Sequence, residues 1–180
     1  MKNNTDNRIN VAKVIFQYMK NHPYNFGLMF LNSPIGISNG RIIYKVSNKN
    51  TVRNNKSVIA ISAMSEDRKS YIVITDDYYD EAPVYVQEFI ELHEIGHIKN
   101  GDLDSNKSIC ANKLAYNLSR CVGLGRGAEI EYAADKYSAS IVGYNNAINA
   151  LRYLVDNFNF GLGGNSEIRR RIKRLQREMG

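Results

Sequence analysis

Two histidines and a glutamate lie within one helical turn near the middle of the chain, where residues 93–97 read HEIGH. On an α-helix, His93 and His97 at i and i+4 share one face, so both imidazole rings can bind one metal ion. Glu94 is offset by about 100° from His93, which lets its carboxylate reach a metal-bound water without being a ligand. Zinc lowers the pKa of such a water to about 7, and a nearby carboxylate can accept its proton. The pattern predicts one Zn2+ per chain at a hydrolytic site.

A catalytic zinc needs a third protein ligand, and Glu131 is the best candidate. Residues 129–135 read EIEYAAD, so Glu131 and Asp135 lie at i and i+4 on one face of a predicted helix. Glu131 would complete a His, His, Glu site, and Asp135 would accept a hydrogen bond from the free ring N–H of a ligand histidine. Glu129 is an alternative ligand, but it has no acidic partner at i+4. His22 precedes a proline at a predicted helix end and is the weakest candidate.

Small residues near these positions predict that the two helices lie close together. Gly96 stands inside the first helix, where glycine costs about 1 kcal/mol relative to alanine, so a packing reason is expected. Ala134 and Ser138 continue the face of Glu131 and would let the second helix approach the metal helix. The same side chains could instead lie on solvated helix faces without a metal, but the presence of both motifs favours the metal site.

The elements that must position these residues follow an α+β order, with a small, mostly antiparallel sheet of three or four strands before a run of helices. Short β-branched runs predict strands at residues 42–46, 58–63 and 71–75. Apolar periodicity and end signals predict helices at residues 7–20, 80–99, 109–122, 128–142, 146–158 and 166–178.

Length and composition fit one domain over residues 1–180, with 43% hydrophobic residues for a single core. Neither a membrane span nor a signal peptide is expected, because the apolar runs are short and residues 1–10 are polar. The two cysteines, Cys110 and Cys121, are expected to be buried thiols, which favours a reducing cytoplasm. The Asn-, Lys- and Ile-rich composition is typical of an AT-rich bacterial or phage genome.

Much of the net charge of +6 lies near the C-terminus, where residues 169–174 read RRRIKR. A basic helix can attract nucleic acid or acidic peptides, but it is more often a solvated face, so nucleic acid is not the expected partner. A zinc-stabilised protein that binds a polypeptide or nucleic acid without cutting it is the alternative from another class. Glu94 argues against it, because a structural zinc has no use for an unliganded glutamate there. The sequence does not predict the oligomeric state.

The segments HEIGHIKNGD at 93–102 and EYAAD at 131–135 resemble the gluzincin metallopeptidases of the HtpX and CAAX-prenyl-protease type. The likeness extends over residues 58–175 and includes Arg171-Ile172-x-x-Leu175. It implies a zincin-like domain with an HExxH helix and a C-terminal helical part, in a soluble minimal form. It also implies a zinc endopeptidase that hydrolyses protein or peptide substrates, in which an edge strand, here residues 58–63, pairs with the substrate backbone.

Two features depart from that family. Many relatives are embedded in membranes, whereas no membrane span is expected in this chain. The relatives also often carry His-Pro before the last helix, where this chain has Asn165-Ser166. Asn165, Arg169 or Arg171 could stabilise the oxyanion in place of that histidine. The pattern is also similar to the ImmA/IrrE peptidases, which are associated with cleavage of transcriptional repressors. A further alternative is a latent enzyme in which residues 1–25 or a loop cover the cleft.

Overall fold

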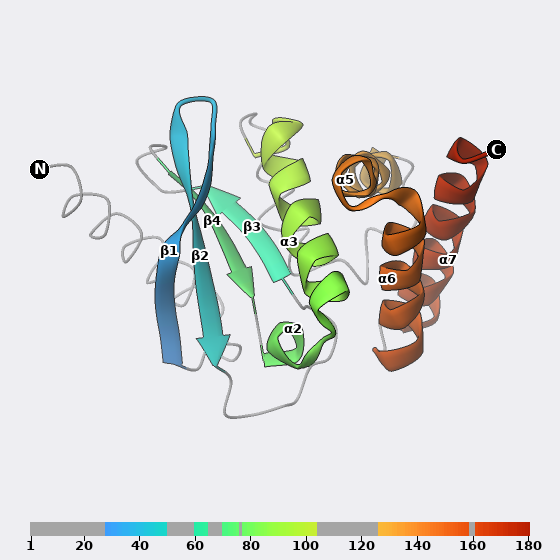
Figure 1. Cartoon of the computed structure of the whole chain (residues 1–180), viewed down its shortest axis with the longest axis horizontal. Coiled ribbons are helices and arrows are strands. Elements are labelled where there is room, and N and C mark those ends of the chain that lie inside the picture. The colour runs from blue at the N-terminus through green and yellow to red at the C-terminus, as the bar shows by residue number, and fades with distance from the viewer. Residues whose placement is uncertain (1–27, 50–59, 65–69, 76, 104–125, 159–160) are drawn as a thin grey trace, which may run out of the picture.

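The computed structural model describes residues 28–49, 60–64, 70–75, 77–103, 126–158 and 161–180. This part of the chain forms a four-stranded sheet and five helices, with helix α3 lying between the sheet and the helices α5, α6 and α7 (Figure 1). The predicted α+β class is confirmed. None of the described helices is both long enough and apolar enough to cross a membrane.

The sheet is mixed, with the strand order β1-β2-β4-β3. Its strands are β1 (Leu28–Ser38), β2 (Arg41–Lys49), β3 (Ala60–Met64) and β4 (Ser70–Thr75). The β1–β2 and β3–β4 pairings are antiparallel, whereas β2 and β4 are parallel. The sheet is therefore mostly antiparallel, as predicted, and β1 and β3 form its two edges.

Strand β1 was not predicted, because its sequence interrupts the usual strand pattern. Its pairing with β2 is irregular around Pro34 and Gly36, two residue types that weaken a strand interior. An edge strand tolerates these two residues, because it forms backbone hydrogen bonds to a neighbouring strand on one side only. The connection to β2 is tight, because Asn39 and Gly40 both adopt positive φ angles of 51° and 72°, as in the type I′ turn of an Asn-Gly hairpin.

Alternate residues of the two central strands pack on opposite faces of the sheet. On one face, Ile43, Tyr71 and Val73 form a core with Ile95 and Ile98 of α3. All six residues of β4 are buried, which agrees with its continuous apolar run. Burial on this face fixes α3 against the sheet.

A polar contact also joins the sheet to α3. The Lys45 ammonium of β2 donates hydrogen bonds to Glu91 Oε2 at 2.7 Å and to the Tyr79 hydroxyl at 2.6 Å. The Tyr79 hydroxyl in turn donates to Glu91 at 3.0 Å. The three side chains come from β2, α2 and α3, so they help to hold the N-terminal half of α3 in place.

The helices are α2 (Asp77–Glu81), α3 (Val84–Lys99), α5 (Arg126–Val142), α6 (Tyr144–Asn157) and α7 (Gly161–Glu178). The single helix predicted at 80–99 is wrong at its start. Pro83 has an extended ψ of 148° and caps α3, so α2 ends before it and α3 begins after it. The last helix begins at Gly161, five residues earlier than predicted, whereas α5 and α6 match their predictions within two residues.

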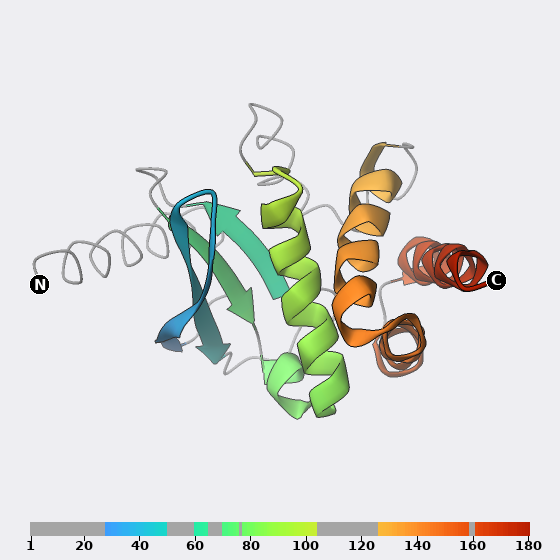
Figure 2. The same ribbon diagram turned by 45° about the horizontal axis from the view of Figure 1, so that its top comes forward.

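The second core joins α3 to the three C-terminal helices. Val86 and Phe89 of α3 pack with Leu151 of α6 and Leu175 of α7 in one buried cluster. Figure 2 shows α3 and α5 side by side, with α6 and α7 beyond α5. Several predictions concern residues outside the described part of the chain, namely the helices at 7–20 and 109–122, His22, Cys110 and Cys121.

Candidate metal centre

Helices α3 and α5 approach each other closely where the two sequence motifs meet. A Cβ atom added to Gly96 would lie 3.0 Å from both the Cα and the carbonyl oxygen of Ala134. One helical turn away, the Ser138 hydroxyl donates a hydrogen bond of 3.0 Å to the carbonyl oxygen of Phe89. The packing reason expected for Gly96 is confirmed, as is the close approach allowed by Ala134 and Ser138.

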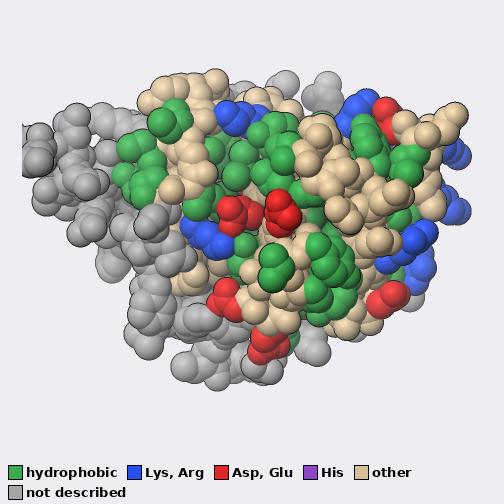
Figure 3. All heavy atoms as spheres, in the orientation of Figure 1, with side chains coloured by type: hydrophobic (Ala, Val, Ile, Leu, Met, Phe, Trp, Pro, Cys, Tyr) green, Lys and Arg blue, Asp and Glu red, His purple; other side chains and the backbone are tan. Residues whose placement is uncertain are grey.

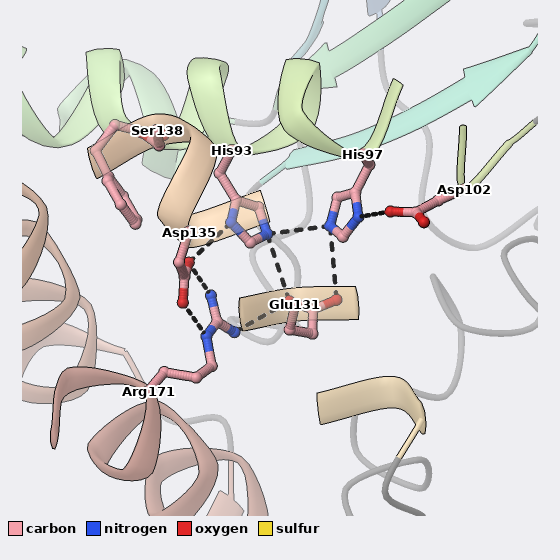
Figure 4. Close-up of polar contacts among 8 residues, drawn as sticks. His93, His97, Asp102, Glu131, Asp135, Ser138 and Arg171 are labelled. Atoms are coloured by element: carbon pink, nitrogen blue, oxygen red, sulfur yellow. Dashed lines mark hydrogen bonds and ion pairs between the residues drawn. The ribbon is translucent and has the colours of Figure 1, made fainter. Parts of the chain in front are cut away.

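This approach brings His93, His97 and Glu131 together around one point, called the metal point below (Figure 4). The two histidine Nε2 atoms are 3.2 Å apart. Glu131 Oε2 lies 3.4 Å from His93 Nε2, and Oε1 lies 3.6 Å from His97 Nε2. A tetrahedral ion with metal–ligand distances of about 2.0–2.1 Å separates its ligand atoms by about 3.4 Å. The three side chains therefore fit a metal ion, and two imidazoles with one carboxylate are a donor set that zinc accepts.

The metal-binding set is shielded from solvent. The side chains of His93, His97 and Glu131 are 11%, 12% and 16% exposed, and no histidine of the described residues is visible on the face shown in Figure 3. Glu94 follows His93 on α3 and is 9% exposed as a residue. Such burial limits dielectric screening, so the charges around this point interact strongly.

The chain reversal at the end of α3 places Asp102 beside His97. Gly101 has a φ of +75°, and the N–H groups of Gly101 and Asp102 donate to the carbonyl oxygens of Ile98 and His97. These two hydrogen bonds make a Schellman motif, which turns the chain back at the end of the helix. As a result, Asp102 Oδ2 lies 2.9 Å from His97 Nδ1, where it can orient the ring and leave Nε2 facing the metal point.

Asp135 contacts the other histidine, as the sequence predicted. Its Oδ1 atom lies 2.9 Å from His93 Nδ1, although this nitrogen forms no regular hydrogen bond within the described residues. Asp135 itself is fully buried. Both histidines thus have a carboxylate beside Nδ1 and have Nε2 directed toward Glu131 (Figure 4).

A buried arginine from α7 connects the two acidic residues. Arg171 donates through Nε and Nη2 to the two carboxylate oxygens of Asp135, each at 2.5 Å. Its Nη1 donates to Glu131 Oε2 at 3.0 Å. Arg171 is only 8% exposed, so the three hydrogen bonds satisfy a charge that has little access to water.

The neighbouring charges shift the pKa values of this cluster. Burial lowers the pKa of His93, but the carboxylates of Asp135 and Glu131 outweigh burial and raise it to about 10. Burial raises the pKa of Glu131, yet the hydrogen bond with His93 and the charge of Arg171 hold it well below its usual range. The pKa of Asp135 is lowered despite burial, chiefly by the charge of Arg171. Without a metal, the positive charges of protonated His93 and of Arg171 therefore balance the negative charges of Glu131 and Asp135.

The geometry separates Glu131 from the alternative ligand, Glu129. Glu129 is exposed and forms two hydrogen bonds with Arg174, at 2.7 and 2.8 Å. The Arg174 guanidinium also lies over the ring of Tyr132, 3.8 Å from its centroid. Glu129 is thus engaged on the outer side of α5, whereas Glu131 faces the histidines.

The basic run at 169–174 does not form a single charged face. Arg171 points inward, and Arg174 is paired with Glu129. Arg170 lies 3.3 Å from Glu167, while Arg169 and Lys173 are exposed. Figure 3 shows Lys and Arg side chains at the side of the molecule that α7 forms. This division weakens the case for a nucleic-acid-binding surface.

The structure also distinguishes the three candidates for oxyanion stabilisation. Arg171 is fully engaged by two carboxylates, and Arg169 is exposed. Asn165 is half-buried, and its Oδ1 has no hydrogen-bond partner within the described ranges. The unpartnered atom of Asn165 is thus an acceptor, whereas stabilisation of an oxyanion requires a donor.

Two contributions to the site were missed from the sequence. Asp102 was quoted within a motif without a role, although Asn100-Gly101 before it is a helix-end signal that predicts a reversal of the chain. Arg171 was expected in a basic run, in the family-like tail or at the oxyanion, but not as a partner of Asp135. A basic residue alone gives no sign that it is buried, but the positions of Ile168, Ile172 and Leu175 place Arg171 beside the apolar face of α7.

Comparison with protein-family models, with curated proteins and with solved structures finds no match to this chain.

Proposed function

We propose that this chain is a zinc-dependent endopeptidase with a zincin-like arrangement, in which His93, His97 and Glu131 bind one Zn2+. The distances between the donor groups carry the proposal: the two Nε2 atoms are 3.2 Å apart, and the Glu131 carboxylate lies 3.4 Å from His93 Nε2 through Oε2 and 3.6 Å from His97 Nε2 through Oε1. They agree with the edges of a tetrahedron around zinc, which leaves the fourth position for water. Both ring orientations support this reading, because each Nδ1 faces an aspartate and each Nε2 faces the metal point.

When bound, zinc would supply a water of lowered pKa and would polarise the substrate carbonyl. Glu94 would accept the proton of that water and then donate it to the leaving amine, as a general base and acid. Asp102 and Asp135 would hold the two imidazoles in the orientation that presents Nε2. Asn165 is one candidate from the sequence for donating a hydrogen bond to the developing oxyanion through its amide.

The position of β3 supports a polypeptide substrate. This strand overlaps the segment 58–63 proposed to pair with the substrate, and its described residues, Ala60–Met64, form one edge of the sheet. Strand β3 pairs with β4 and lies against α3, which carries the histidines. An extended peptide added to this edge would run beside the metal helix. The resemblance of the two motifs to gluzincin peptidases supports the same reaction class.

The first experiment is zinc analysis of protein purified without chelators, beside His93→Ala and Glu94→Gln. We expect about one zinc per chain in the wild type and in Glu94→Gln, and none in His93→Ala. Cleavage is then measured on a mixed peptide library by mass spectrometry. Loss of the general base should lower the cleavage rate by a factor of about 10² to 10⁴ while zinc stays bound.

Each result has a distinct meaning. Equal zinc in the wild type and His93→Ala would show that the metal point is elsewhere, and the proposal would fail. Full cleavage by Glu94→Gln would remove only the role of Glu94. One zinc with no cleavage of any library peptide, together with salt-sensitive binding to DNA or RNA, would favour the non-catalytic alternative.

A further inference from the structure

We propose that Arg171 is a positioning residue of the metal centre, which keeps Glu131 in place as the third ligand by binding Glu131 and Asp135 at the same time. The inference rests on the proposed zinc site and concerns how the C-terminal helix keeps that site ready for the metal. It holds for ligation through either oxygen of Glu131 or through both.

The carboxylate of Glu131 has polar contacts with His93, His97 and Arg171. The two histidine contacts are made by Nε2, the same nitrogen atoms that face the metal point. Once these nitrogens bind a metal, they can no longer donate hydrogen bonds to Glu131. Arg171 donates through Nη1 to Oε2 at 3.0 Å, and it is therefore the contact that can persist with and without the metal.

A second reason to assign this role to Arg171 is the repulsion between two neighbouring carboxylates. Glu131 and Asp135 lie one turn apart on α5 and are largely shielded from water, so their negative charges repel each other strongly. Arg171 offsets this repulsion, because Nε and Nη2 donate to Asp135 while Nη1 donates to Glu131. Without the cation, we expect Glu131 to turn away from Asp135 and toward solvent.

The direction of Nη1 is set by the rest of this contact. A guanidinium is planar, so two nitrogens bound to one carboxylate determine where the third nitrogen points. Asp135 is fully buried and lies beside His93, and Ile172, which follows Arg171 on α7, packs in the core. Figure 4 shows Arg171 reaching from α7 to both carboxylates. Arg171 thus relates the place of the third ligand to that of the first ligand histidine.

Two effects of Arg171 on zinc binding oppose each other. Its positive charge repels a cation at the metal point, so charge alone predicts that removal of Arg171 strengthens zinc binding. Its hydrogen bond holds a ligand in place, so positioning alone predicts that removal weakens binding. We expect positioning to dominate, because Glu131 relieves the repulsion from Asp135 by leaving the metal point, which removes a ligand.

The test is the zinc dissociation constant of the full chain, measured by competition with a chromophoric chelator. Arg171→Met should weaken zinc binding about 10- to 100-fold. Unchanged or tighter binding would overturn the inference. Arg171→Lys keeps the charge, but one ammonium cannot bind both carboxylates as the planar fork does, so it should also bind zinc more weakly than the wild type. Wild-type affinity in Arg171→Lys would overturn the inference too, because charge alone would then suffice.

Crystal structures of the metal-free proteins give a readout that a loss of stability alone would not change. In the wild type, the Glu131 carboxylate should face the two histidines, whereas in Arg171→Met it should turn away from them. An unmoved carboxylate in the variant would overturn the inference. If Arg171→Met fails to fold, the zinc affinity of Arg171→Lys decides.

Arg174→Met is the matched control. Arg174 lies on the same helix and binds Glu129 through two nitrogens, but Glu129 is not among the metal-binding residues. Its replacement should leave the zinc affinity unchanged. An equal weakening in Arg174→Met and Arg171→Met would overturn the inference, because it would show only a general effect of α7.

Failure of the proposed function would give a different result. A wild-type chain that binds no zinc, or binds it equally after His93→Ala, would contradict the proposed site itself. Zinc that is lost in His93→Ala but bound with wild-type affinity by Arg171→Met would contradict only the role of Arg171.

Discussion

His97 Nδ1 and Asp102 Oδ2 lie 2.9 Å apart, although Asp102 follows the end of the helix that carries His97. The contact exists because the chain reverses at Gly101 and returns Asp102 to the last turn of α3. One continuous segment of ten residues, 93–102, therefore provides two candidate metal ligands, the candidate general base and the carboxylate that orients the second ligand.

Asp102→Asn should weaken zinc binding by about 10- to 100-fold with a small change in stability. The amide keeps the shape of the side chain but removes the charge that makes it a strong acceptor for the imidazole N–H. The zinc dissociation constant can be measured by competition with a chromophoric chelator. Asp156→Asn is the control, because Asp156 is exposed on α6. Equal affinities for Asp102→Asn and the wild type would show that Asp102 does not act on the ligand.

Gly101→Ala should destabilise the protein by roughly 1–2 kcal/mol, because a side chain is unfavourable at its φ of +75°. Among the described residues, no atom outside its immediate chain neighbours lies within 4 Å of the added Cβ, so the cost is conformational and not steric. Gly101→Asn should cost less, since asparagine tolerates this region better. Thermal unfolding of the three proteins tests the order. Equal melting temperatures for Gly101→Ala and the wild type would contradict it.

Gly96→Ala should destabilise the protein and weaken zinc binding, although alanine favours a helix by about 1 kcal/mol. The added methyl group would press on the backbone of Ala134 at 3.0 Å and push α3 away from α5. Denaturant unfolding and zinc titration measure the two effects. Gly163→Ala on α7 provides the contrast, because Gly163 is exposed and its replacement should gain stability. A stabilised Gly96→Ala would mean that the helices have room to adjust.

The metal-free protein should lose stability as the pH rises from about 7 to 10. The pKa of His93 is raised to about 10 in the folded protein from an ordinary value of 6.5, so the folded state binds a proton that the unfolded state has released. This contribution is fully present below pH 6.5 and is lost as the pH rises through 10. Zinc should abolish the dependence, since a ligand imidazole is neutral in both states.

Chemical unfolding at several pH values, with and without a chelator, measures this effect. Metal-free His93→Ala is the reference, because other groups that titrate near pH 10 are common to both proteins. The difference in unfolding free energy between the wild type and this variant should decrease toward high pH. A difference that stays constant between pH 7 and 10 would show that His93 is not protonated in the metal-free protein.

The residues of the candidate site were predictable from local spacing, whereas its outer contacts were not. His93, His97, Glu131 and Asp135 were identified because positions four apart share a helix face. Gly96 indicated the close contact between α3 and α5, because glycine is unfavourable inside a helix unless packing requires it. These inferences required only the geometry of one helix at a time.

The remaining features depend on relations between distant segments. Arg171 reaches Asp135 across 36 positions of sequence, and nothing local distinguishes it from its basic neighbours. Strand β1 was missed because Pro34 and Gly36 contradict strand propensity, which an edge position with irregular pairing tolerates. The split between α2 and α3 was missed because proline suits the first turn of a helix as well as the position before it.

The position of Arg171 has a consequence for the order of events during synthesis. A ribosome builds the chain from its N-terminus, so both histidines, Glu131 and Asp135 are made well before α7. Until residue 171 has left the ribosome and its helix has docked, two buried carboxylates lack the cation that neutralises them. The contacts of the candidate metal centre can therefore be complete only after residue 171 has left the ribosome and α7 has docked.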